Sequence, residues 1–243
     1  MYVQTYTGSA YLGLPINRNY LMVPSYLNSI HCVLNEALVE HPRTLVVGAI
    51  LRMPEISLCK NEFDRFSCIT RFIESFKSRV KADINRKRNL GKRVHNTSIR
   101  YVWCREKSFS KNEHFHIFLL LNGDTYWQLG SLKYPTPGHI SCMINEAWNC
   151  AIGANDENYN GLVEYSGQPV KLDARLFASY YRYNTYACIY MNSYESVFYW
   201  MSYLAKVDTK QFGDGVRNFG CSQAKNINEK HFRKTVMSLN DCN

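Results

Sequence analysis

The sequence predicts an α+β sandwich in which long helices alternate with antiparallel strands. Several segments carry apolar residues at intervals of three and four, which is the spacing of an amphipathic helix. Between them lie short runs rich in branched and aromatic residues, which are typical of strands. No internal repeat, low-complexity tract or Pro/Gly linker divides the 243 residues, so we predict a single domain.

The first half of the chain is expected to hold a helix, a strand and a longer helix. Residues 1–23 look irregular, whereas apolar residues recur at helical spacing from 25 to 40. The run Arg43–Met53 (RTLVVGAILRM) has the composition of a strand. A long helix follows from Asn61, with apolar residues three and four apart as far as Val80.

A β-hairpin is expected in the middle of the chain. Residues 98–106 (SIRYVWCRE) and 114–122 (HFHIFLLLN) have the pattern of two strands joined by a polar loop. A helix then begins near Pro137 and reaches about Ile152, and a short strand follows at 161–165.

The last predicted element is a helix from Ser193 to about Val207. Ser193 is a suitable N-cap, and Glu195 then falls in the first turn. The tyrosine-rich stretch 171–190 before it fits neither pattern clearly and is left unassigned.

The chain is basic, with 29 Lys and Arg against 20 Asp and Glu and a net charge of +9. Such an excess favours an anionic partner, and nucleic acid is the commonest one, although a merely basic surface explains the charge alone equally well. Eight positive charges gather at the end and exit of the long helix, against the single Asp83. These residues, here called the basic stretch, are Lys77, Arg79, Lys81, Arg86, Lys87, Arg88, Lys92 and Arg93.

The basic stretch is expected to track the phosphates of a nucleic acid, with exposed aromatic residues elsewhere stacking on single-stranded bases. A solvated helix end is the alternative interpretation of these charges.

Cysteine use and hydropathy favour a cytoplasmic protein without a membrane partner. The nine cysteines are scattered without a Cys-x-x-Cys pair, as expected of reduced, mostly buried thiols. The longest apolar stretches, Leu45–Leu51 and Ile117–Leu121, are too short to cross a bilayer, and the N-terminus lacks the pattern of an export signal.

The second strand of the hairpin opens with His114-Phe115-His116. Side chains alternate along a strand, so the two histidines project from one face and Phe115 from the other. Two neutral imidazoles on a rigid strand make half of a divalent-metal site.

Glu106 is the candidate third ligand, because it ends the preceding strand near the same edge of the hairpin. Strand register, which the sequence does not fix, decides whether it shares the face of the histidines. Two imidazoles and one carboxylate leave coordination positions open, as a catalytic metal requires. The alternative for Glu106 is a solvated strand end.

Tyr199, Tyr203 and Lys206 fall at i, i+4 and i+7 of the last helix, within about 60° of one another on one face. A tyrosine hydroxyl beside a lysine is a plausible nucleophile, because the ammonium favours the phenolate. With 18 tyrosines in the chain, however, such spacing also arises by chance, and Tyr186, Tyr190 and Tyr194 are expected to be packing residues.

The order of these parts resembles the HUH endonucleases of rolling-circle replication. More narrowly, YVWCRE, HFHIFLLLN, the helix ending in EAW and SYLAKVDTK resemble the prophage-associated replication proteins of the YagK/YfjJ C-terminal-domain type, which are grouped with inovirus replication initiators. The resemblance covers about residues 43–222, leaving 1–42 as an N-terminal extension with one helix and 223–243 as a tail. It implies a ferredoxin-like, HUH-type antiparallel sheet of four to five strands packed with helices.

Carried over residue by residue, the resemblance makes His114 and His116 metal ligands and Glu106 the third ligand. Tyr203 becomes the nucleophile and Lys206 its neighbour.

Tyr199 matches the second tyrosine of the two-tyrosine initiators. A single-tyrosine enzyme in which Tyr199 only packs is an equally good interpretation.

The activity implied is that of an endonuclease which nicks single-stranded DNA at an origin through a 5′-phosphotyrosine link, leaving a 3′-OH to prime replication of a phage or prophage. A divalent ion, Mg²⁺ or Mn²⁺, would act as a Lewis acid on the scissile phosphate. The chain has no P-loop motif, so a separate helicase would open the duplex, and a host polymerase would extend the primer in the bacterial cytoplasm. The alternatives are a single-tyrosine HUH transposase and a non-catalytic DNA-binding regulator with the same fold.

Overall fold

The structure is a computed structural model. It describes residues 3–54, 67–107, 113–132, 136–154, 161–176 and 187–223, with the backbone alone for 187–192. Within these ranges, no helix combines the length and the apolar character that a membrane span requires.

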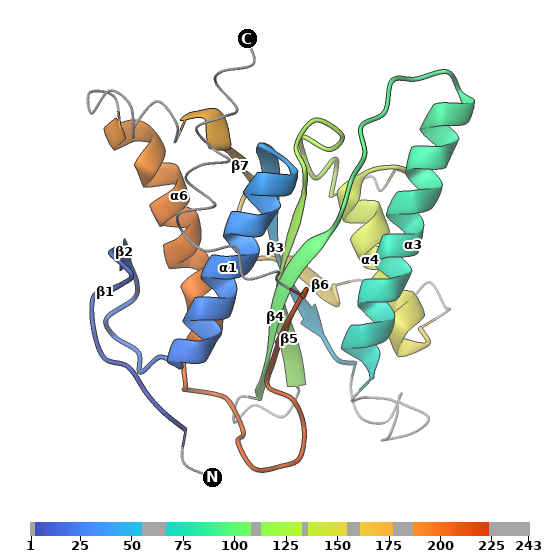
Figure 1. The fold of residues 1–243 in the computed structure, drawn as a ribbon. Helices are drawn as coiled ribbons and strands as arrows, with labels where there is room; N and C mark the ends of the chain where they lie inside the picture. The colour runs from blue at the N-terminus through green and yellow to red at the C-terminus, as the bar shows by residue number, and fades with distance from the viewer. Residues whose placement is uncertain are drawn as a thin grey trace.

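An antiparallel sheet of six strands forms the centre of the fold, in the order β6-β3-β5-β4-β8, with β7 beside β3 (Figure 1). The strands are β3 (Arg43–Arg52), β4 (Arg100–Lys107), β5 (Glu113–Asn122), β6 (Val163–Tyr165), β7 (Val170–Asp173) and β8 (Phe219–Cys221). The α+β prediction is confirmed, with one strand more than the four to five expected. The sheet is nevertheless five positions wide, because β6 and β7 pair with different halves of the same edge of β3.

Helices cover both faces of the sheet (Figure 1). On one face lie α1 (Pro24–Glu40) and α6 (Ala187–Ser202), and on the other α3 (Cys68–Asn89) and α4 (Ile140–Ile152). Strand alternation divides the core accordingly. The odd-numbered residues of β5 from Phe115 to Leu121 join the α3/α4 core, whereas Phe118 and Leu120 join the α1/α6 core.

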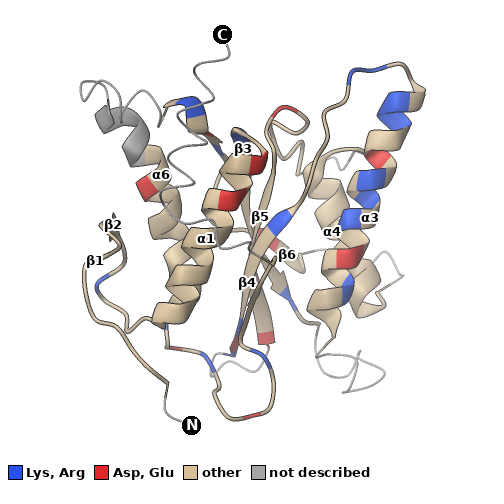
Figure 2. Cartoon of the chain, in the orientation of Figure 1, with Lys and Arg blue, Asp and Glu red and all other residues tan. Residues whose placement is uncertain are grey.

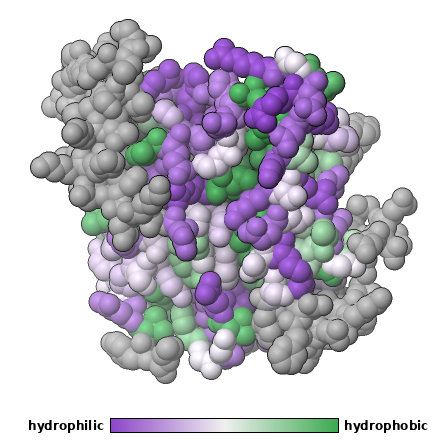
Figure 3. Space-filling view, turned by 45° about the vertical axis from the view of Figure 1, so that its right-hand side comes forward, coloured by the Kyte–Doolittle hydropathy of each residue, from purple (hydrophilic) through white to green (hydrophobic). Residues whose placement is uncertain are grey.

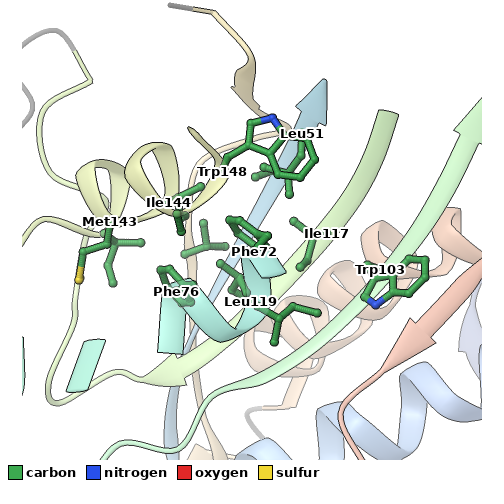
Figure 4. Packing of buried hydrophobic residues seen from close by; sticks show 14 of the residues in the cluster. Leu51, Phe72, Phe76, Trp103, Ile117, Leu119, Met143, Ile144 and Trp148 are labelled. Atoms are coloured by element: carbon green, nitrogen blue, oxygen red, sulfur yellow. The ribbon is translucent and has the colours of Figure 1, made fainter. Parts of the chain in front are cut away.

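Aromatic packing holds α3 and α4 against the sheet (Figure 4). The indole of Trp148 meets the rings of Phe72 and Phe115 edge-on, with centroid separations of 6.0 and 6.1 Å. Burial of one such side chain stabilises a fold by about 1.5–3 kcal/mol. The α3/α4 layer therefore anchors β5, the strand that carries the two histidines.

Residues 1–42, which the resemblance leaves outside its core, contribute to the packed interior. Leu27, Ile30 and Leu34 of α1 are fully buried against the sheet. The segment before α1 forms the small hairpin β1 (Ala10–Tyr11) and β2 (Leu14–Pro15) instead of being wholly irregular.

The start of the last helix differs from the prediction. α6 is already helical at Ala187, the first described residue of this part of the chain, so Ser193 lies inside the helix, is not its N-cap, and does not place Glu195 in the first turn. Because the backbone is helical on both sides of Ser193, the N–H groups that follow it bond within the helix and need no cap. Residues 177–186, most of the unassigned tyrosine-rich stretch, lie outside the described residues.

The end of that helix also differs. α6 stops at Ser202, and Tyr203–Ala205 form the 3₁₀ turn η2 instead of continuing to Val207. The cause is pairing with the N-terminal segment. Val23 donates a backbone hydrogen bond to Ala205 (2.8 Å) and Val207 donates one to Leu21 (2.8 Å), which holds the chain extended beyond η2.

The other predicted elements are present with small shifts at their ends. The long helix begins at Cys68, with Ser67 as its N-cap residue, and not at Asn61 as predicted; residues 61–66 lie outside the described residues. Tyr194, expected to be a packing residue, is buried and donates its hydroxyl to Asn35 Oδ1 at 2.5 Å.

Candidate metal and tyrosine site

Strand register places Glu106 on the face of the two histidines. Glu106 pairs directly with His114, and Cys104 pairs with His116, in the β4–β5 ladder. Residues opposite each other in an antiparallel pair point to the same side of the sheet. The three residues therefore project together toward the α1/α6 side, at the end of the sheet where the hairpin turns.

These three side chains, here called the candidate metal group, have the spacing of metal ligands. His114 Nε2 lies 3.2 Å from His116 Nε2, and Glu106 Oε2 lies 3.4 Å from His116 Nε2 and 3.8 Å from His114 Nε2. Ligand atoms around an ion at about 2.1 Å stand about 3.0–3.4 Å apart. A small inward shift of Glu106 therefore suffices for all three atoms to bind one divalent ion.

Buried charge surrounds Glu106, whose side chain is only 3% exposed. Burial by itself raises the pKa of this carboxyl, but its hydrogen bond to His116 and the charges of His116, Lys206 and Lys210 outweigh burial and lower the pKa to about 2. Glu106 is therefore an anion throughout the neutral range, as a metal ligand must be.

Tyr203 is linked to Glu106 through Lys206. Lys206 Nζ donates to the Tyr203 hydroxyl and lies 3.2 Å from Glu106 Oε2. Burial by itself lowers the pKa of Lys206, but the hydrogen bond to Tyr203 and the charge of Glu106 outweigh it and raise the pKa. Lys206 is therefore a charged donor to the phenol oxygen.

The 3₁₀ turn explains why Tyr203 and Lys206 meet although the α-helix ends before them. A 3₁₀ turn has three residues per turn, so residues i and i+3 lie one above the other. The ring of Tyr203 also packs against the ring of His116, with centroids 5.5 Å apart. The phenol thus lies beside a member of the candidate metal group.

Tyr199 lies in a different environment. Its side chain is 44% exposed, and among the described residues its hydroxyl has no hydrogen-bond partner. It borders a cavity that His116 and Tyr203 also line. Tyr199 is near the site, but it lacks the lysine that accompanies Tyr203 and it is not packed in the core.

The basic stretch does not meet this site. It lies on and after α3, which covers the opposite face of the sheet (Figure 2). Its last residues precede Arg100, which pairs with Leu120 at the other end of the hairpin from Glu106. The two groups of residues therefore lie at different ends as well as on different faces of the sheet.

Several charges of the basic stretch are engaged within the fold. Arg86 and Lys87 both bind the buried carboxylate of Asp83, at 2.6 and 2.7 Å, and Arg79 pairs with Glu146. In the described part of the chain, neither Lys81 nor Lys92 nor Arg93 forms an ion pair, and all three are exposed.

A groove of about 430 Å³ runs between α3 and the approach to β4. Lys77, Lys81 and Arg88 border it, and Val80, Ile84 and Ile99 are its apolar lining. Figure 3, which turns the α3 side forward, shows hydrophilic side chains with smaller hydrophobic patches between them over this part of the surface.

Two parts of the site were missed by reasoning from the sequence. Lys210 is fully buried, with Nζ 3.9 Å from Glu106 Oε1 and donating to the Lys206 carbonyl at 2.7 Å. It lies beyond the predicted end of the last helix, so no helical spacing could indicate it. Tyr20, from the segment expected to be irregular, meets the Tyr203 ring edge-on at 5.8 Å. No local pattern indicates that contact.

The chain is similar to known proteins over most of its length. The sequence is 30% identical to the uncharacterized protein YagK of Escherichia coli (strain K12) over 207 residues, covering 82% of this chain and 91% of YagK. It is 28% identical to the uncharacterized protein YfjJ of the same organism over 208 residues, covering 83% of this chain and 95% of YfjJ. No solved structure matches. Residues 12–222 match the YagK/YfjJ C-terminal domain, and the chain therefore belongs to that family.

Proposed function

We propose that this protein is a metal-dependent endonuclease of the HUH type that nicks single-stranded DNA with Tyr203 as nucleophile. One observation carries the proposal: Lys206 joins the Tyr203 hydroxyl to the carboxylate of Glu106, beside His114 and His116. A nucleophile, a buried cation and three metal-ligand atoms thus form one continuous set of contacts.

The donor set suits Mg²⁺ or Mn²⁺, and its two imidazoles favour Mn²⁺ in vitro. His114, His116 and Glu106 would hold the ion. When bound, it supplies Lewis-acid stabilisation of the charge that develops on the phosphate oxygens.

The residues of the chain account for the rest of the nicking step. Tyr203 releases its phenolic proton to solvent, and the ammonium of Lys206 stabilises the phenolate that remains. The phenolate oxygen attacks phosphorus as the bond from phosphorus to the 3′ oxygen breaks. The departing 3′ oxygen takes up a proton and becomes a free 3′-OH, while the 5′ side stays linked to Tyr203.

In this proposal the 3′-OH primes rolling-circle replication of a phage or prophage, with a separate helicase and a host polymerase completing the process. The basic stretch would bind flanking DNA and not the nucleotide at the nick, because α3 lies on the other face of the sheet.

Covalent capture tests the proposal. The protein is incubated with Mn²⁺ and single strands from the replicon that carries its gene, labelled at the 3′ end so that the label remains with the tyrosine-linked fragment. We expect a labelled protein adduct that chelation prevents and that Tyr203→Phe does not form. Binding without an adduct would favour the DNA-binding regulator, and transfer of the adduct into a second target strand would favour the transposase.

A further inference from the structure

A cavity of about 320 Å³ adjoins the tyrosine site and is not used by the nicking step. Five of the residues that line it carry rings: His116, Phe118, Tyr199, Trp200 and Tyr203. We call it the aromatic pocket. Since His116 and Tyr203 belong to both, a ligand in the aromatic pocket is adjacent to the atoms that would act on a phosphate.

Trp200 is a fixed wall of the aromatic pocket. Its indole meets the ring of Phe118 edge-on at 4.7 Å and lies over Gly48, in the middle of β3. A Cβ at Gly48 would stand 2.7 Å from the indole and 2.4 Å from Ser166 Oγ. Glycine weakens a strand interior, and here its position is explained by the close approach of Trp200.

The chemistry of the walls favours a flat, uncharged ring. Phe118, Tyr199 and Trp200 offer aromatic surface, and no carboxylate, lysine or arginine lines the pocket among the described residues. Asn17 and Ser166 add amide and hydroxyl groups at its edge. Nucleobases bind in such settings by stacking between aromatic side chains with hydrogen bonds at their edges.

We propose that the aromatic pocket holds the nucleobase of the nucleotide next to the scissile phosphate, and that Tyr199 stacks on this base and is not a second nucleophile. This inference rests on the proposed nuclease function, since it takes single-stranded DNA as the ligand. It assigns the exposed ring of Tyr199 a binding role and leaves Tyr203 as the one tyrosine that attacks.

Photocrosslinking tests base contact without knowledge of the origin. The probe is a short thymidine oligonucleotide carrying 5-iodouracil, bound to the Tyr203→Phe variant so that no phosphotyrosine forms. We expect peptide mapping to find the crosslink on Tyr199 or Trp200. Crosslinks confined to other regions, such as the exposed Trp127 beyond the far end of β5, would overturn the inference.

Affinity measurements on matched variants test whether the ring of Tyr199 contributes to binding. Tyr199→Leu removes the ring from an exposed position, so we expect normal folding and about tenfold weaker binding of the oligonucleotide. Tyr199→Phe keeps the ring and should keep the affinity, whereas Trp127→Leu removes an exposed ring elsewhere and should change nothing. Wild-type affinity for Tyr199→Leu would overturn the inference.

The two proposals fail separately. If wild-type protein forms no covalent adduct but the crosslink to Tyr199 or Trp200 persists, the nuclease proposal fails and the base pocket stands. If the adduct forms through Tyr203 while Tyr199→Leu binds normally, the pocket inference alone fails. A covalent adduct mapped to Tyr199 would overturn the stacking role directly.

Discussion

Lys206 Nζ lies 3.2 Å from Glu106 Oε2, and both side chains are almost completely buried. Burying an ammonium without a partner costs much free energy, so the Glu106 carboxylate holds the charged end of Lys206 in this position. The same nitrogen donates to Tyr203, and a small change at Lys206 should therefore affect the tyrosine and the carboxylate together.

Lys206→Met tests that link. It removes the charged donor to the Tyr203 hydroxyl and keeps much of the side-chain volume, so we expect single-turnover nicking to fall about a hundredfold, comparable to the loss of one catalytic donor. DNA affinity should be nearly unchanged. The exposed Lys171→Met is the matched control and should nick normally; equal rates for the two variants would remove Lys206 from the mechanism.

Loss of either histidine should abolish nicking while DNA binding persists. His114→Ala and His116→Ala each remove one of three metal-ligand atoms, whereas affinity depends mainly on phosphate contacts elsewhere. The measurement is cleavage in excess Mn²⁺ beside oligonucleotide binding. His95→Ala, at the opposite end of the sheet, serves as the control. Wild-type cleavage by either ligand variant would contradict the metal-site assignment.

Glu106 should matter for stability as well as for metal binding. Glu106→Ala leaves Lys206 and Lys210 without their buried carboxylate, so we expect the free energy of unfolding to fall by about 3–5 kcal/mol. Nicking by the folded fraction should be partly restored by high metal concentration, because Glu106→Ala keeps the two adjacent imidazoles on β5, whereas each histidine variant breaks that pair. Glu164→Ala, whose ion pair with Arg52 is exposed, should change stability by less than about 1 kcal/mol in denaturant titration.

Tyr203→Phe should fold normally, bind DNA and form no covalent complex. The substitution keeps the ring against His116 and removes the only atom of that side chain that can attack phosphorus. Mass spectrometry of the trapped wild-type adduct should locate the DNA on Tyr203. DNA found on any other tyrosine would refute this assignment even if nicking itself were metal-dependent.

The basic stretch can be tested without disturbing the fold. Neutralising Arg86, Lys87 and Arg88 together should weaken DNA binding, but it also strips two partners from the buried Asp83. Changing Lys81, Lys92 and Arg93 to Gln avoids this. Each lost phosphate contact should reduce the slope of log K against log salt by about 0.7 for single strands. An unchanged slope would place the DNA path on another face.

How far the site could be predicted depends on the range of the interactions that build it. Alternation in a strand correctly placed His114 and His116 on one face, because that property is local. Whether Glu106 faces them depends on pairing across the hairpin, which an apolar alternating pattern does not determine. In the structure, Glu106 pairs with His114 in the β4–β5 ladder, and this register puts Glu106 on the same face as the histidines.

The last helix shows the other limit. Ideal helical geometry predicted that Tyr203 and Lys206 share one face of an α-helix. The two side chains do make contact, but through a 3₁₀ turn that the sequence did not indicate. That turn and the contact of Tyr20 with Tyr203 depend on a segment from the other end of the chain. Nothing in the neighbouring residues encodes such a pairing.

The backbone pairing of Leu21 and Val23 with Val207 and Ala205 has a consequence for biosynthesis. During translation the segment Leu21–Val23 leaves the ribosome early. Its partners Ala205 and Val207 are synthesised only after most of the described chain. Contacts this distant in sequence close late, after the local helices and the hairpin. A nascent or prematurely terminated polypeptide therefore carries the two histidines without Tyr203 and Lys206, so under the proposed function it has no nucleophile with which to nick DNA.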